Sequence, residues 1–259
     1  MENFKDTELF LFDLDGTVYV GDKPIDGALD TIERIKAAGK KVCYLTNNSS
    51  KPRSLYMSNL KKMGIDLHDG ELYTSSQATA EYLLREQKGK KVYLLATDAV
   101  KADFVSYGID VVEDGAEVAV LAFDTTATYD KLNKFCRYIF GGAVFVATHG
   151  DKNCPYPISP MPDVGSFIAL VTAVTGRTPD AICGKPYQAC ADGIFLKFGG
   201  IDPKNIAMVG DRLYTDIRFG NSFGMRSVLV LTGDTTREML KNAEDRPAVV
   251  LESIKHIVF

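Results

Sequence analysis

The chain has 259 residues, of which 46 % are hydrophobic and 25 % are charged, and its formal net charge is -4. These values are typical of a globular protein of one or two domains and exclude a disordered chain. The sequence contains neither a basic run suited to a nucleic acid polymer nor an apolar stretch long enough to span a membrane. Its acidic start lacks the features of a signal peptide, so a cytoplasmic protein is expected.

The first predicted strand is the apolar run Leu9–Phe12, and two carboxylates, Asp13 and Asp15, follow it. Such a run predicts a strand covered on both faces, and Gly16 allows the chain to turn sharply after it. Ligands of open parallel sheets bind beside the carboxyl ends of the strands, so these carboxylates indicate a reactive site. An ordinary turn is the alternative. A calcium loop is disfavoured because no further acidic residues follow at alternate positions.

Helix and strand patterns alternate along the rest of the chain. A helix is predicted over 28–36, and polar residues follow each later strand of the same series. We expect four parallel strands to end at one edge of a sheet, over residues 9–12, 41–45, 206–209 and 227–231.

The middle of the chain carries an alternation of its own. Helices are predicted over 78–84 and 129–140, and strands over 92–96, 118–122 and 143–147. The Pro-rich stretch from Cys154 to Pro162 can continue neither a helix nor a central strand, so an ordered surface loop is expected there. The pattern predicts an α/β domain over 76–180, inserted into a domain formed by 1–75 and 181–259.

Four features could meet at the edge of the predicted sheet: Asp13 with Asp15, Thr46 with Asn47, Lys185, and Asp211 with Asp216. Because phosphate repels a carboxylate nucleophile, a phosphoryl-transfer site needs a divalent cation, hydrogen-bond donors and a positive side chain. Asp13 and Asp211 are hard oxygen ligands suited to Mg²⁺, and Lys185 can supply the positive charge. The four features together therefore predict phosphoryl transfer.

Each feature alone has an ordinary explanation. Gly184-Lys185 matches a P-loop only in part, because Pro186 stands where a Ser or Thr must bind the metal. Asp216 could cap a helix, and Lys185 could be a solvated lysine. The five cysteines and three histidines show no zinc or disulfide pattern. The joint occurrence of the features at successive strand ends favours the phosphoryl-transfer interpretation.

These residues resemble the motifs of the haloacid dehalogenase (HAD) superfamily of phosphatases, in its NagD and p-nitrophenylphosphatase-like branch (subfamily IIA). The motifs read Asp13-Leu14-Asp15-Gly16-Thr17, Thr46-Asn47-Asn48-Ser49, Gly184-Lys185-Pro186 and Gly210-Asp211-Arg212-Leu213-Tyr214-Thr215-Asp216. The resemblance extends over nearly the whole chain. It implies an α/β fold: a Rossmann-like parallel-sheet HAD core with an inserted α/β cap domain of the C2 type.

The resemblance also implies a role for each matching carboxylate. Asp13 would attack phosphorus to form an aspartyl-phosphate, and it would bind Mg²⁺ together with Asp211 and the backbone carbonyl of Asp15. Asp15 would protonate the leaving oxygen and then activate water. Asp216 would orient the water molecules around the ion.

Other matching residues would contact the substrate. Thr46 and Asn47 would hold the phosphoryl oxygens, and Lys185 would offset charge between phosphate and Asp13. In the family, a cap inserted after the second motif closes over the site and contacts the substrate. The segment after the predicted strand at 143–147 therefore supplies candidates for substrate selection, which are Thr148, Gly150, Asn153 and above all His149 and Asp151.

The function implied by the resemblance is Mg²⁺-dependent hydrolysis of small phosphomonoesters, such as nucleoside monophosphates and sugar phosphates, with p-nitrophenyl phosphate as an artificial substrate. A phosphomutase or phosphotransferase would use the same motifs, although the known mutases generally carry the cap between the first and second motifs. A non-catalytic phosphate-binding regulatory protein is a third interpretation, which the intact Asp15 disfavours. The expected partner is a small phosphorylated metabolite, with no nucleic acid polymer and no membrane, for a monomer or homodimer.

Overall fold

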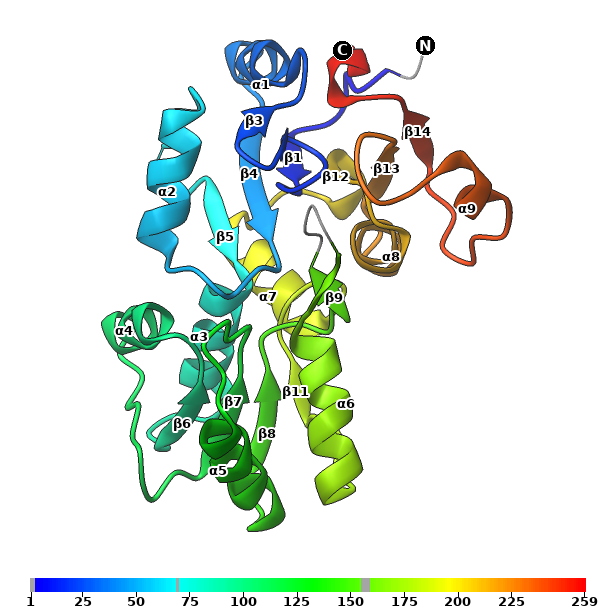
Figure 1. Ribbon diagram of the computed structural model, residues 1–259. Coiled ribbons are helices and arrows are strands. Elements are labelled where there is room, and N and C mark those ends of the chain that lie inside the picture. The colour runs from blue at the N-terminus through cyan, green and yellow to red at the C-terminus, as the bar shows by residue number, and fades with distance from the viewer. Residues whose placement is uncertain (1–2, 69, 155–158) are drawn as a thin grey trace. The chain divides into compact units, whose positions relative to one another are not determined.

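The computed structural model describes residues 3–68, 70–154 and 159–259, and it divides into two compact units. The first unit consists of Met1–Thr46, Met57–Tyr73 and Ile194–Phe259, and the second of Asn47–Tyr56 and Thr74–Gly193. Residues 47–56, 74–75 and 181–193 thus group with the second unit, whereas the predicted domains place them in the core; those domain boundaries stay a prediction. Each unit contains a sheet with parallel strands (Figure 1).

The first unit is built on a six-stranded sheet with the order β14-β13-β12-β1-β4-β5. Its strands are β1 (Leu9–Phe12), β4 (Lys41–Thr46), β5 (Leu72–Thr74), β12 (Ile206–Gly210), β13 (Arg226–Val230) and β14 (Val249–Leu251). β1 pairs in parallel with both β4 and β12, so that Phe12 lies beside Tyr44 and Val209. All of β1 is buried, and the ring of Phe10 stacks on that of Phe12 at 5.9 Å. The strand is therefore covered on both faces, as its apolar sequence predicts.

Helices and turns complete the first unit. α1 (Ala28–Ala37) buries Ile32 and Ile35 on one face, as the helical period of its apolar residues predicts. A short antiparallel hairpin is formed by β2 (Tyr19–Val20) and β3 (Lys23–Pro24). The other elements are the end of α2 (Arg53–Lys62), α8 (Arg218–Ser222), α9 (Arg237–Lys241), the π-helical turn η2 (Leu213–Ile217), and the 3₁₀ turns η1 (Pro203–Asn205) and η3 (Ile254–His256).

The second unit is built on a four-stranded sheet with the order β11-β8-β7-β6, in which all neighbouring strands are parallel. Its strands are β6 (Val92–Leu95), β7 (Val118–Leu121), β8 (Val144–Ala147) and β11 (Ala181–Ile182). Its helices are α3 (Ser75–Glu86), α4 (Asp98–Ser106), α5 (Tyr129–Phe140), α6 (Val164–Thr175) and the start of α7 (Gln188–Lys197). Thr74, Thr97 and Thr128 cap α3, α4 and α5 with their hydroxyl groups. Phe135 of α5 meets Phe145 of β8 edge to face at 5.4 Å, within the core of this unit.

The Pro-rich stretch is described only at its ends. These ends form a short antiparallel pair, β9 (Asn153–Cys154) with β10 (Met161–Pro162). Residues 155–158, on which the middle of the predicted loop falls, lie outside the described residues.

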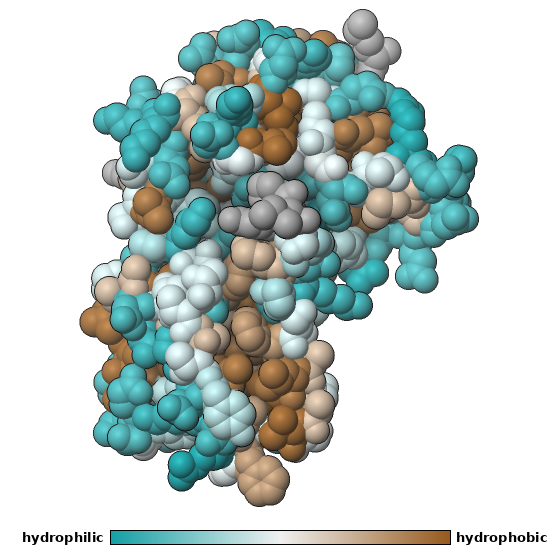
Figure 2. All heavy atoms as spheres, in the orientation of Figure 1, coloured by the Kyte–Doolittle hydropathy of each residue, from teal (hydrophilic) through white to brown (hydrophobic). Residues whose placement is uncertain are grey.

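Helix α6 follows this pair, in a segment where the sequence predicts no element. Figure 2 shows apolar surface over this helix, where Leu170 and Val174 are exposed. The oligomeric state, monomer or homodimer, stays a prediction. Within the described ranges, no helix combines the length and apolar character that crossing a bilayer requires.

The predicted fold class is confirmed, since both units are of the α/β type and both sheets contain parallel strands. The parallel pairing of β13, β12, β1 and β4 also brings the four predicted strand ends to one edge of the first sheet.

Candidate active site

Three neighbouring strand ends of the first sheet carry predicted site residues. Asp13 follows β1 directly, and its N–H donates to the carbonyl oxygen of Val209 at 2.9 Å. Thr46 is the last residue of β4, and Asp211 is the first residue after β12. Because β4, β1 and β12 are adjacent and parallel, these residues lie at the same edge of the sheet, where ligands of parallel sheets bind.

Three carboxylates gather at this edge. Asp13, Asp211 and Asp216 each offer an oxygen atom, and these atoms lie within 4.8 Å of one another. Asp216 is not a helix cap, because the turn η2 begins after Arg212 and Asp216 lies inside it. Its Oδ2 accepts a hydrogen bond from the N–H of Arg212 at 3.1 Å. A Cβ atom at Gly210 would lie 2.2 Å from Cγ of Asp216, so the close approach of this carboxylate requires glycine there.

Two glycines pack closely against the carboxyl group of Asp211. A Cβ atom at Gly16 would lie 2.5 Å from its Oδ2, and one at Gly233 would lie 2.0 Å from the same atom. This Oδ2 accepts a hydrogen bond from the N–H of Asp234 at 2.6 Å, whereas Oδ1 is buried and has no hydrogen-bond partner among the residues that the structure describes. Burial, and next the negative charge of Asp216, raise the pKa of Asp211 to about 7.

This donor set fits a divalent cation. Hard oxygen ligands on neighbouring loops suit Mg²⁺, and a cation beside them would offset the repulsion among the carboxylates. Oδ1 of Asp211, which has no hydrogen-bond partner within the described part of the chain, is a buried acceptor of the kind that such an ion satisfies.

Asp15 lies in the turn after β1 and is exposed, whereas Leu14 before it is buried. Gly16 has a φ of 86°, a conformation that favours glycine, and its N–H donates to the carbonyl oxygen of Tyr19 at 2.8 Å. The hydroxyl group of Tyr19 donates to Oδ2 of Asp15 at 3.3 Å. The exposed carboxyl group of Asp15 is thus held on an ordered turn.

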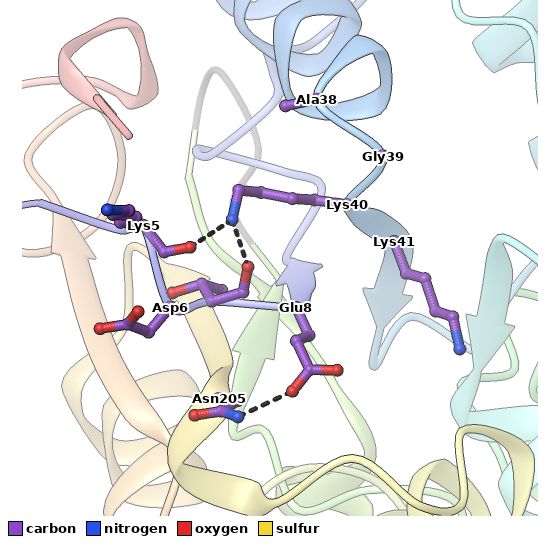
Figure 3. A pocket seen from close by; sticks show the side chains of 9 residues that line it. Lys5, Asp6, Glu8, Ala38, Gly39, Lys40, Lys41 and Asn205 are labelled. Atoms are coloured by element: carbon purple, nitrogen blue, oxygen red, sulfur yellow. Dashed lines mark hydrogen bonds between the residues drawn. The ribbon is translucent and has the colours of Figure 1, made fainter.

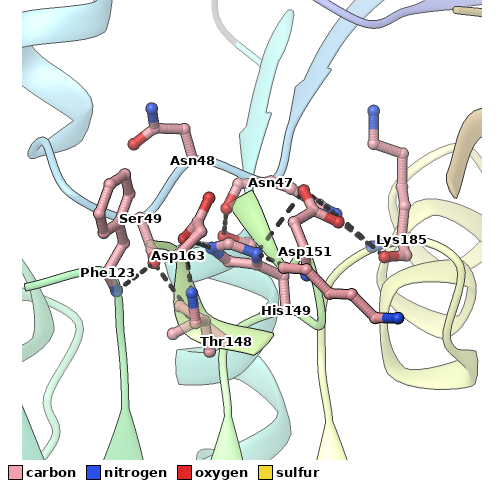
Figure 4. Close-up of polar contacts among 12 residues, drawn as sticks. Asn47, Asn48, Ser49, Phe123, Thr148, His149, Asp151, Asp163 and Lys185 are labelled. Atoms are coloured by element: carbon pink, nitrogen blue, oxygen red, sulfur yellow. Dashed lines mark hydrogen bonds and ion pairs between the residues drawn. The ribbon is translucent and has the colours of Figure 1, made fainter. Parts of the chain in front are cut away.

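Asn47 and Lys185, from the second and third motifs, lie together in the second unit (Figure 4). The N–H of Lys185 donates to Oδ1 of Asn47 at 2.8 Å, and Nδ2 of Asn47 donates to the carbonyl oxygen of Lys185 at 3.0 Å. A Cβ atom at Gly184 would lie 2.6 Å from Oδ1 of Asn47. Glycine before the lysine therefore allows the two motifs to approach each other.

The two cap candidates, His149 and Asp151, are buried beside a residue that the sequence analysis does not single out, Asp163. Nδ1 of His149 lies 3.7 Å from Oδ2 of Asp151, and its Nε2 lies 3.5 Å from Oδ1 of Asp163. The only sequence signal for Asp163 is its position one residue before α6, which it caps by accepting a hydrogen bond from the N–H of Val164. Each ring nitrogen faces a different carboxylate, so we interpret the three side chains as an internal polar network.

A hollow of about 470 Å³ lies at the amino ends of the strands of the first sheet (Figure 3). Its lining includes Lys41, the first residue of β4, and the Glu8–Asn205 pair, whose side chains share a hydrogen bond of 2.7 Å. No predicted site residue lines it. Figure 3 shows that the Lys40 ammonium group is already bound by backbone oxygens. The hollow is therefore separate from the carboxylate cluster.

Comparison with known families gives two matches. Residues 10–110 match the haloacid dehalogenase-like hydrolases, and residues 182–257 match a second group of HAD-like hydrolases. The acid sugar phosphatase of Staphylococcus haemolyticus is 34 % identical over 248 residues, which cover 95 % of this chain and 92 % of the relative.

Solved structures superpose on nearly the whole chain. The 4-nitrophenylphosphatase from Thermotoga maritima superposes with a TM-score of 0.93 at 41 % identity, over 97 % of this chain and 96 % of that one. The glycerol phosphate phosphatase from Mycobacterium tuberculosis, solved in complex with magnesium, gives a TM-score of 0.88 at 27 % identity, over 97 % and 77 % of the two chains.

Proposed function

We propose, because this chain belongs to the haloacid dehalogenase-like hydrolase family, that it releases phosphate from small phosphomonoesters by way of an aspartyl-phosphate. The family, its NagD and p-nitrophenylphosphatase-like branch and the phosphatase class are those that the motifs predict, and they are confirmed. What we propose beyond this class is the aspartyl-phosphate intermediate, the Mg²⁺ ion and the substrates.

The observation that supports the proposal best is the carboxylate cluster at the ends of β1 and β12. Asp211 and Asp216 are faced by glycines at which a Cβ atom would collide with their carboxyl groups, so the backbone is shaped around these members of the cluster. Burial, and next the negative charge of Asp216, raise the pKa of Asp211, so its ionised form is unfavourable without a cation. Such an arrangement suits catalysis better than it suits folding stability.

The carboxylate of Asp13, the backbone carbonyl of Asp15 and the carboxylate of Asp211 would hold Mg²⁺, and Asp216 would orient the water molecules around the ion. When bound, the cation supplies positive charge between the phosphate and the carboxylates, which lowers their repulsion. The fit rests on the Asp211 oxygen for which the described ranges offer no hydrogen-bond partner, and on the separations within 4.8 Å in the cluster.

The chain's own residues perform the transfer in two steps. An oxygen of Asp13 attacks phosphorus while the bond to the leaving oxygen breaks, and Asp15 gives its proton to that oxygen. Asp15 then takes a proton from water as the water oxygen attacks phosphorus, which releases phosphate and restores the Asp13 carboxylate. The exposed position of Asp15 supports this role, because an acid must reach groups of the substrate.

The resemblance assigns the remaining contacts with phosphate to Thr46, Asn47 and Lys185. Thr46 supports this assignment by its place at the end of β4, beside the strand that carries Asp13. Asn47 and Lys185 are bonded to each other, so that two of the family's motifs form one local structure. Sugar phosphates and nucleoside monophosphates are the proposed substrates, with p-nitrophenyl phosphate as the substrate for assays.

The test is the release of inorganic phosphate from a panel of phosphomonoesters, measured with Mg²⁺ and with EDTA. The variant Asp13→Asn removes the nucleophile, and Asp22→Asn is its matched control, because Asp22 is an exposed carboxylate on the turn between β2 and β3. We expect release by the wild type and by Asp22→Asn with Mg²⁺, and none by Asp13→Asn or in EDTA. Acid-quenched protein should carry a phosphoryl group on the peptide that contains Asp13.

Three results would contradict the proposal. Release that persists in Asp13→Asn would show that another group attacks phosphorus. Transfer of the phosphoryl group to a sugar hydroxyl without release to water would indicate a mutase or phosphotransferase, and binding of phosphate esters without either reaction would indicate a regulatory protein.

A further inference from the structure

Four buried side chains and the backbone of a fifth buried residue form a continuous polar network within the second unit, and Figure 4 shows these residues together. In order of contact they are Asp163, His149, Asp151, Asn47 and Lys185, the last through its backbone. Asn47 and Asp151 lie 104 residues apart in the sequence, and Asn47 and Lys185 lie 138 apart. The network therefore joins the second and third motifs to the segment after β8.

The side-chain amide of Asn47 is engaged by protein groups on both sides. Its oxygen accepts from the N–H of Lys185, so its nitrogen must face the other way. That nitrogen donates to the carbonyl oxygen of Lys185 at 3.0 Å and to the two carboxylate oxygens of Asp151 at 3.3 and 3.2 Å. Rotating the amide by half a turn would place its oxygen against three other acceptors. Asp151 and Lys185 thus fix one orientation of Asn47.

Asp151 is in turn held by its neighbours. Its backbone N–H donates to Nδ1 of His149 at 3.4 Å, and its Oδ2 lies 3.7 Å from the same nitrogen. The other ring nitrogen of His149 lies 3.5 Å from Oδ1 of Asp163. Asp163 is anchored at the start of α6, where its side chain accepts the N–H of Val164 at 2.7 Å. The backbone of Asp151 is bound to the same helix, since its carbonyl oxygen accepts the N–H of Gly165 at 2.8 Å.

Packing leaves little room for these groups to move. A Cβ atom at Gly165 would lie 2.5 Å from the carbonyl oxygen of Gly150, and one at Gly184 would lie 2.8 Å from Cβ of His149. Asp151 is 5 % exposed and His149 is fully buried. Side chains that are this enclosed, with their polar atoms directed at one another, are suited to hold a neighbouring group in place.

We propose that Asp151 is a positioning residue for catalysis, which holds the amide of Asn47 and through it the backbone at Lys185. His149 and Asp163 support Asp151 from the side of α6. The inference rests on the proposed function, because it gives Asn47 and Lys185 a part in binding phosphate. It assigns Asp151 a role different from the selection of substrates that the family resemblance implies for this segment.

The two roles have opposite consequences for a panel of substrates. A residue that selects the substrate contacts the part that differs between esters, so its loss changes their relative rates. A residue that positions the phosphate-binding groups acts on the part that all the esters share, so its loss lowers kcat/KM by a common factor. The loss of a supporting contact of this kind lowers activity by about 10- to 100-fold.

The experiment compares Asp151→Ala, Asp151→Asn and the control Asp180→Ala in the full-length protein with Mg²⁺. Asp180 belongs to the same unit but precedes β11, where its carboxylate accepts the N–H of Phe145. For each variant we would measure kcat and KM on sugar phosphates, nucleoside monophosphates and p-nitrophenyl phosphate. We expect kcat/KM of Asp151→Ala to fall by the same factor for all of them. The fall should be smaller for Asp151→Asn, whose amide oxygen can still accept from Asn47, and absent in the control.

Amide hydrogen exchange supplies a readout that is independent of activity. The N–H of Lys185, which is bonded to Asn47, should exchange faster in Asp151→Ala than in the wild type. The N–H of Val92, which donates to the carbonyl oxygen of Asp110 at 2.9 Å, lies outside the network and serves as the internal reference. Thermal denaturation identifies a variant that fails to fold, in which case Asp151→Asn provides the test.

Several results would overturn the inference. A changed ranking of substrates would show that Asp151 selects among them, and unchanged exchange at Lys185 would show that it does not hold this loop. Faster exchange with unchanged kcat/KM would show that the loop has no part in the reaction. If the wild type itself releases no phosphate from any ester, the proposed function fails, whereas the exchange measurement still decides whether Asp151 holds the loop.

Discussion

Replacing Asp211 by asparagine should change how the stability of the metal-free protein depends on pH. Burial and the charge of Asp216 raise the pKa of Asp211 to about 7 in the folded protein, against 3.8 as the usual value. The folded state therefore binds the proton more tightly than the unfolded state does. The stabilisation by this proton is fully present below pH 4 and is lost as the pH rises through 7. An asparagine keeps the shape and removes this titration.

The size of the effect follows from the two pKa values. A shift from 3.8 to about 7 corresponds to a total of about 4 kcal/mol. Between pH 5 and pH 8 the wild type should lose roughly 2–3 kcal/mol of unfolding free energy relative to Asp211→Asn, since part of the change falls below pH 5. For a chain of this length, that difference corresponds to a shift of roughly 5–10 °C in Tm.

The assay is thermal denaturation in EDTA at a series of pH values, for the wild type, Asp211→Asn and the exposed-site control Asp22→Asn. Subtracting the variant's curve from that of the wild type removes the contributions of other titrating groups. We expect this difference to fall steadily as the pH rises above about 4 and to level off above about pH 7. The control Asp22→Asn should parallel the wild type.

Added Mg²⁺ should reverse the loss at pH 8. A cation at one hundred times its Kd stabilises the state that binds it by about 2.7 kcal/mol, and the variant should gain much less because it lacks the Asp211 carboxylate. The reasoning would be refuted if the unfolding free energies of the wild type and of Asp211→Asn in EDTA depended on pH in parallel. Such curves would show that ionising Asp211 does not destabilise the folded protein.

Two further predictions concern single side chains. Gly233→Ala should weaken Mg²⁺-dependent stabilisation and phosphatase activity at least tenfold, because its Cβ atom would lie 2.0 Å from Oδ2 of Asp211. Gly199→Ala should behave as the wild type, because the nearest atom would lie 3.4 Å from its Cβ atom. Equal effects of the two substitutions on Mg²⁺ titrations followed by calorimetry would contradict this prediction. Alkylation at pH 8, followed by peptide mass spectrometry, should modify Cys154 before Cys43. Burial raises the pKa of the Cys43 thiol to about 12, whereas Cys154 is only half-buried. Faster labelling of Cys43 in the folded protein would contradict this prediction.

The sequence by itself determines the order of strands and helices and the residues that follow each strand. The apolar run of β1, the helical period of α1 and the glycine after Asp15 are local signals, because each depends on residues only a few positions apart. The same signals fail for α6, which is rich in Val, Ile and Thr and apolar on more than one face, so neither propensity nor period predicts a helix there. Motif spacing also suffices to predict the family.

Only the tertiary structure decides which side chains hold one another. The bonds from Asn47 to Asp151 and Lys185 span more than a hundred residues, and no local pattern encodes such pairings. Asp163 has no sequence signal beyond its helix cap, and it joins the network because β8 and the start of α6 bring it to His149. The raised pKa of Asp211 likewise depends on burial and on Asp216, since desolvation and the distance between charges exist only once the chain has folded.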